Sequence, residues 1–150
     1  MKILFVHGLA SSGAYKLADM LRITLKAEVL APDVPIDPDE ALEMLRALCR
    51  REEPDLVVGL SWGGFLVHRL HGIRRALINP DLQVARLLRT MTGVVEYLSP
   101  RRDGTATFTV TPALCDRYDT FAFTSGIFLS KSSMVICAIS GMTAIARRRV

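Results

Sequence analysis

The sequence predicts an α/β protein with a doubly wound parallel sheet. Short apolar runs alternate with segments whose apolar residues recur at helical spacing. The runs are uninterrupted rather than alternating, which is typical of strands buried on both faces of a parallel sheet. Turn residues follow the runs at His7-Gly8 and Asn79-Pro80. With 150 residues the chain is long enough for one domain with a sizeable core.

The expected elements follow from these patterns in chain order. Four strands are expected, at residues 3–6, 28–31, 55–59 and 76–78. Helices are expected between them, at residues 15–27, 38–51 and from 62 through Leu70. The second helix has the clearest start, because Asp37 can cap it, Pro38 suits its first position and Glu40 its third.

The stretch from Leu56 to Gly64, LVVGLSWGG, carries the strongest functional signal. It is a G-x-S-x-G motif with a predicted strand before it and a predicted helix after it, as in a nucleophile elbow. Gly59 and Gly63 are needed there because a Cβ at either position would collide with a neighbouring strand or helix. Ser61 is therefore the predicted nucleophile. The alternative is a tight strand-to-helix turn in which the serine only caps the helix.

A serine nucleophile needs backbone N–H groups that stabilise the developing oxyanion. The N–H of Trp62, directly after the serine, is the first candidate. The second is the N–H of Leu9, because the loop after the first strand should pass close to Ser61. Gly8 is expected to allow this close approach, and the small residues 10–13 to keep the loop tight.

A serine also needs a base within about 3 Å, and the sequence supplies no obvious one. His7 is expected to orient its loop by hydrogen bonding. His68 and His71 are expected on the helix after the elbow, roughly 10 and 15 Å along its axis from Ser61 at about 1.5 Å per residue. The chain has no other histidine.

Three stretches resemble the YqiA-like esterase family of small α/β hydrolases. They are the opening ILFVHGLASSG, the elbow LVVGLSWGGFL and the later ALINPDL, all within residues 1–120. The resemblance implies a cytoplasmic enzyme with the α/β-hydrolase fold that acts on short acyl esters. In it Ser61 would be the nucleophile, and Leu9 and Trp62 would be the oxyanion donors. It also implies an acid and then a histidine on later strands, which this sequence does not match.

Residues 81–120 are expected to form a cap-like excursion or an ordinary peripheral one. It should contain a helix at 84–91, a polar loop at 100–104, a strand at 105–110 and a helix at 111–118. Asp103, Asp116 and Asp119 are the only acidic residues late enough to serve as a triad acid.

Residues 121–150 form an atypical apolar and basic tail. From Thr120 onward the chain has no Asp, Glu, Asn, Gln or His. Three explanations are open: a frameshifted or replaced terminus, a membrane segment over 120–146, or a strand near 134–139 followed by a short helix. A membrane segment would carry Lys131 near its centre, at a cost of about 2.5–3.5 kcal/mol. The first explanation predicts a sheet truncated at its C-terminal edge.

Charge and cysteine content exclude other functions. The net charge of +4 comes entirely from the tail, because residues 1–119 hold fifteen acidic and fifteen basic residues. A neutral body with a basic tail argues against a nucleic-acid partner. The three cysteines, Cys49, Cys115 and Cys137, have no metal-like spacing and suit free thiols in a reducing compartment. No metal or cofactor is expected, and no signal peptide is visible.

The sequence therefore predicts a serine ester hydrolase with a small-molecule ester substrate, located in the cytoplasm. Ser61 is its nucleophile, and its base and acid are unassigned. The alternative is a catalytically inactive hydrolase-fold remnant, or a binding module with a replaced or membrane-associated C-terminus.

Overall fold

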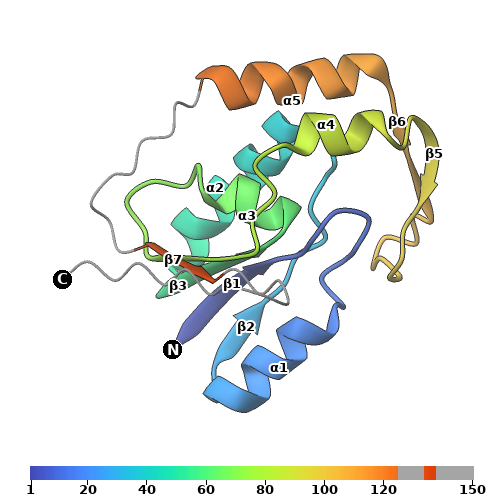
Figure 1. Cartoon of the computed structure of the whole chain (residues 1–150). Coiled ribbons are helices and arrows are strands. Elements are labelled where there is room, and N and C mark those ends of the chain that lie inside the picture. The colour runs from blue at the N-terminus through green and yellow to red at the C-terminus, as the bar shows by residue number, and fades with distance from the viewer. Residues whose placement is uncertain (125–133, 138–150) are drawn as a thin grey trace.

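The computed structural model describes residues 1–124 and 134–137 of the chain. At its centre the described residues form a five-stranded sheet in the order β2-β1-β3-β4-β7 (Figure 1). All four neighbouring pairs of strands are parallel, which confirms the predicted sheet. Its strands are β1 (Lys2–Val6), β2 (Glu28–Leu30), β3 (Leu56–Leu60), β4 (Arg75–Ile78) and β7 (Met134–Cys137).

The sheet buries residues on both faces, as its uninterrupted apolar runs predict. Successive side chains of a strand point to opposite faces. Leu4 and Val6 of β1 thus belong to one hydrophobic cluster, and Ile3 and Phe5 belong to another. These four side chains are at most 1% exposed.

Helices cover the two faces unequally. Helix α1 (Lys16–Leu25) packs on the face of Ile3, while α2 (Pro38–Glu52) and α3 (Trp62–Val67) pack on the face of Leu4 (Figure 1). The predicted cap of α2 is confirmed, because the Asp37 carboxylate accepts hydrogen bonds from the N–H groups of Asp39 and Glu40.

Helix α3 ends at Val67, so the prediction that one helix carries both His68 and His71 was wrong. The N–H groups of Arg69 and Leu70 bond to carbonyls only three residues earlier, which tightens and closes the last turn. Gly72 then has a positive φ of 78°, which helix geometry does not allow.

The excursion consists of α4 (Val84–Arg89), β5 (Gly93–Glu96), β6 (Thr107–Val110) and α5 (Pro112–Thr124). Strands β5 and β6 form an antiparallel pair beside the sheet (Figure 1). Strand β5 was not expected. Its run offers no apolar alternation, and Val94 is 73% exposed, so only the pairing with β6 makes it a strand.

A strand in the tail, β7, pairs in parallel with β4, with Met134 opposite Arg75. It agrees with the expectation of a strand near 134–139. The other expectations for the tail concern residues 125–133 and 138–150, which lie outside the described residues. Within the described part, no helix is long and apolar enough to cross a bilayer.

Candidate active site

The predicted functional loops gather at one edge of the sheet. His7, Ser61 and Asn79 each directly follow a strand, at the carboxyl ends of β1, β3 and β4. These three strands are adjacent and parallel. Ligands of open α/β sheets bind outside this edge, so the loops lie where a ligand site is expected in such a sheet.

Ser61 has the backbone conformation of a sharp strand-to-helix turn. Its φ of 52° and ψ of −114° lie in a region that non-glycine residues rarely adopt. Such a conformation costs about 1–3 kcal/mol and persists only where the surroundings enforce it. Three backbone hydrogen bonds do so: the Ser61 N–H donates to Ile78 O at 2.9 Å, and Ser61 O accepts from Phe65 N at 3.2 Å and Asp81 N at 3.1 Å.

The two outer glycines of the motif are required by packing, as predicted. A Cβ on Gly59 would lie 2.6 Å from the carbonyl oxygen of Gly63. A Cβ on Gly63 would lie 2.3 Å from Val6 O and 2.5 Å from His7 O. Because all three are backbone atoms, no side-chain rotation can relieve these clashes. The elbow therefore forms only with glycine at both positions.

The loop after β1 passes beside the elbow. A Cβ built on Gly8 would lie 3.8 Å from the Ser61 Cβ and 3.7 Å from Leu60 O, which are ordinary contacts. The approach is therefore close, but the expectation that it needs glycine at position 8 was wrong. The glycine that the loop does need is Gly13, whose Cβ would lie 2.0 Å from Ala31 O.

Both predicted oxyanion donors belong to this edge. Trp62 is the first residue of α3, so its N–H has no acceptor within the helix. Leu9 directly follows Gly8, and its N–H bonds to no acceptor among the described residues. The half-buried Ser61 hydroxyl likewise has no hydrogen-bond partner within the described part of the chain. The arrangement leaves two backbone donors and one hydroxyl at the same edge.

His7 orients its loop, as expected from the sequence, and both ring nitrogens are occupied. The ring is 1% exposed. Its Nε2 accepts a hydrogen bond from Val34 N at 3.0 Å, so Nδ1 carries the proton and donates to Gly8 O at 2.8 Å. Burial lowers the pKa of His7, opposed by the bond to Gly8 O and assisted by the Arg101 charge. His7 is thus held neutral and has no free nitrogen for a serine.

The other titratable candidates have different neighbours. His68 caps the end of α3 and is half-buried, with a pKa lowered by burial and by nearby arginines. His71 is exposed. Asp116 and Asp119 both bind Arg89, at 3.0 and 2.5 Å, on an exposed surface.

Asp103, the third candidate acid, makes a local bond as well. Its carboxylate accepts from Thr105 N at 2.9 Å. The structure therefore pairs none of the three candidate acids with a histidine.

The Trp62 side chain is held by a buried relay that the sequence did not reveal. Its indole Nε1–H donates to the Tyr118 hydroxyl at 2.8 Å, and that hydroxyl donates to Ile36 O at 2.6 Å. Trp62 and Tyr118 are 1% and 0% exposed. Burial raises the pKa of Tyr118, so the phenol stays protonated. No local pattern signals this contact, because its partners lie 56 and 82 residues apart.

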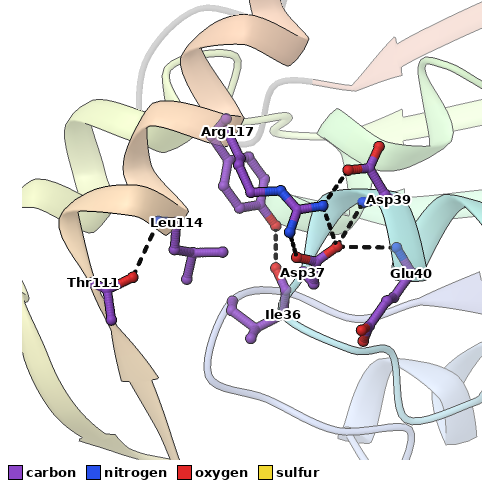
Figure 2. Close-up of polar contacts among 8 residues, drawn as sticks. Ile36, Asp37, Asp39, Glu40, Thr111, Leu114 and Arg117 are labelled. Atoms are coloured by element: carbon purple, nitrogen blue, oxygen red, sulfur yellow. Dashed lines mark hydrogen bonds and ion pairs between the residues drawn. The ribbon is translucent and has the colours of Figure 1, made fainter.

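The loop from Ala31 to Asp37 and the first turn of α2 connect the site to the excursion. Arg117 of α5 forms ion pairs with Asp37 and Asp39, beside Ile36 (Figure 2). From the hairpin side, the Arg102 N–H donates to Asp33 at 2.7 Å.

Asp33 thus holds the loop, Asp37 caps α2, and Asp39 pairs with Arg117. Burial raises the pKa of Asp33, but its bonds from Gly13 and Arg102 and the charge of Arg101 outweigh this and lower it. Among the described residues, no group of histidine, cysteine and acidic side chains could hold a metal ion.

Comparison with known proteins assigns this chain to a family. A model of the alpha/beta hydrolase family matches residues 3–142. A solved structure described as a novel epoxide hydrolase of the alpha/beta hydrolases superfamily, from metagenomes of hot environments, is 17% identical, with a TM-score of 0.42. The match covers 58% of this chain and 37% of that one. No curated protein matches the sequence. The family match covers most of the chain, and the chain therefore belongs to the alpha/beta hydrolase family.

Proposed function

We propose that this chain is a serine ester hydrolase acting on short acyl esters, with Ser61 as the nucleophile. The observation that carries the proposal is the strained backbone of Ser61 at the end of β3, enforced by Gly59 and Gly63. A nucleophile elbow uses this conformation to lift the serine oxygen clear of the sheet. The YqiA-like motifs around the first strand and the elbow support esters as the substrate class.

In the proposed reaction the Ser61 oxygen bonds to the acyl carbonyl carbon, and the carbonyl electrons move onto its oxygen. The N–H groups of Leu9 and Trp62 stabilise that oxyanion. Collapse of the tetrahedral intermediate expels the alcohol and leaves an acyl group on Ser61, which water then removes. The proton of Ser61 must pass to a base, which would be an unexpected residue or one supplied by a partner chain.

A second candidate is an inactive hydrolase-fold protein that has kept the elbow as a binding surface. The occupied ring nitrogens of His7 favour it, because the histidine whose ring lies against Trp62 has no free nitrogen to take a proton. Without triad partners an oxyanion hole and binding give at most about 10³–10⁴-fold acceleration over water.

Labelling with a fluorophosphonate probe, read by intact mass, tests the proposal. We expect one adduct on the wild-type protein, no adduct on Ser61→Ala, and a full adduct on Ser99→Ala as a matched control. Circular dichroism of each protein verifies folding. A folded wild-type protein that takes no adduct would instead support the inactive candidate.

A further inference from the structure

We infer that Tyr118, on helix α5, is a positioning residue for the oxyanion donor Trp62. The inference rests on the proposed function, because it assigns a role to α5 in the same site. It means that the excursion contributes to the elbow rather than lying beside it. Tyr118 touches no reacting atom; it acts through the side chain of Trp62.

The Trp62 N–H needs support from outside its own helix. Helix α3 has only six residues, and two of them are Gly63 and Gly64 in its first turn. Short helices are marginal by themselves, and glycine weakens them further. The residue before Trp62 is the strained Ser61. Contacts from outside the helix must therefore fix the direction of the Trp62 N–H.

The Trp62 side chain makes such contacts with two other parts of the chain. Its ring lies 5.8 Å from the ring of His7, which bonds to Gly8 O next to Leu9. Its indole N–H bonds to Tyr118 of α5. Trp62 is fully buried between them. The indole thus connects the Leu9 loop to helix α5.

Tyr118 is itself held in place by its neighbours. Its hydroxyl donates to Ile36 O, in the loop that also provides Val34 N to His7. Its ring packs 5.6 Å from the ring of Phe65 in α3. Removing the hydroxyl would leave the buried indole N–H without an acceptor and Ile36 O without this donor. A buried polar group without a hydrogen-bond partner is unfavourable, so the indole would shift to find water or another partner.

The test uses Tyr118→Phe and two matched controls. Tyr97→Phe removes a tyrosine hydroxyl from the same excursion, and no hydrogen bond of that hydroxyl is found among the described residues. Arg117→Gln removes the neighbouring attachment of α5 to Asp37 and Asp39 without touching Trp62 (Figure 2). If α5 were only a structural support, Arg117→Gln and Tyr118→Phe would act alike.

Two readouts are measured for each variant. The first is the rate of Ser61 labelling by the fluorophosphonate, with kcat and KM for p-nitrophenyl acetate. We expect Tyr118→Phe alone to lower the labelling rate and kcat by about tenfold with little change in KM, as for a displaced oxyanion donor. The second is the NMR spectrum of the indole N–H, which is unambiguous because Trp62 is the only tryptophan. We expect Tyr118→Phe alone to shift this signal and the Trp62 backbone amide, and to speed indole hydrogen exchange.

The outcomes separate the two claims. A labelled wild-type protein with unchanged rates and amide signals in Tyr118→Phe would overturn the positioning role and leave the proposed function standing. An unlabelled wild-type protein would overturn the proposed function. In that case a shifted Trp62 amide in Tyr118→Phe would still support positioning, and unchanged signals would overturn it as well.

Discussion

The elbow and the excursion meet at Trp62, but they are held by different forces. Around Ser61 the constraints are backbone against backbone: two glycines without room for a Cβ and three main-chain hydrogen bonds. The excursion is held mostly by side chains, namely buried residues such as Leu88 and Tyr118 and exposed ion pairs of Arg89 and Arg117, beside the backbone bond from Leu98 N to Ala10 O at 2.7 Å. A backbone constraint is lost as a whole, whereas side-chain contacts can be lost one at a time. A single substitution should therefore disrupt the whole elbow, whereas the excursion should lose stability in smaller increments as its contacts are removed.

The largest effect is expected from Gly63→Ala, which places a Cβ against Val6 O and His7 O. Because backbone atoms must move, we expect the free energy of unfolding to fall by about 3 kcal/mol or more. Urea unfolding followed by circular dichroism measures it. Gly8→Ala is the matched control, with only ordinary contacts at 3.7 and 3.8 Å, and should change stability by less than about 0.5 kcal/mol. Equal losses in the two variants would contradict the role of packing at the elbow.

The next effect concerns whether the excursion shares the core of the sheet. Leu88 of α4 is 0% exposed and belongs to the same hydrophobic cluster as Leu4 and Leu66. Leu88→Ala should lower the free energy of unfolding by about 2–3 kcal/mol, and the protein should still unfold in a single transition. Leu98→Ala is the control. Leu98 is 85% exposed, so this variant should have almost the free energy of unfolding of the wild-type protein. A separate early transition in Leu88→Ala would show instead that the excursion unfolds as an independent cap.

The same contrast explains what could be predicted from the sequence. The turn at Ser61 was predicted at its position, with strand bounds one residue off, because its rules are local: a strand, two glycines and a helix start within nine positions. Strand β5 was missed because only its pairing with β6 defines it. The Trp62–Tyr118–Ile36 relay was missed because no local pattern connects residues so far apart. His71 was misplaced because the helix ends early, at a turn closed by Gly72.

A smaller effect is expected where the excursion contacts the loop before α2. Asp37 both caps α2 and pairs with Arg117 (Figure 2). Asp37→Ala should lower the free energy of unfolding by about 1 kcal/mol, the usual value of an N-cap. Asp37→Asn keeps the cap and removes the charge, so it should retain most of the stability. If Asp37→Asn lost as much as Asp37→Ala, the ion pair rather than the cap would be the main contribution.

The smallest effect is a dependence of stability on pH from the buried histidines. Burial lowers the pKa of His7 and His68 below 6.5 in the folded protein, so the unfolded chain binds more protons near that pH. Their contribution to stability is complete above about pH 6.5 and is lost as the pH falls toward their folded values. Asp33 does not contribute in this range, because its lowered pKa matters only below 3.8. We therefore expect the melting temperature to fall from pH 7.5 to 5.5.

The variants His7→Asn and His71→Gln assign this dependence to one region. An asparagine at position 7 does not titrate, so its melting temperature should change less between the two pH values. His71→Gln removes a charge that helps to lower the pKa of His68, so it should keep the part of the dependence that belongs to His7. Protonating His7 removes the acceptor for Val34 N, so the loss begins in the Leu9 loop, on the elbow side of Trp62. If His7→Asn kept the full dependence, the pH sensitivity would belong to His68 at the end of α3, and the elbow would be insensitive to pH in this range.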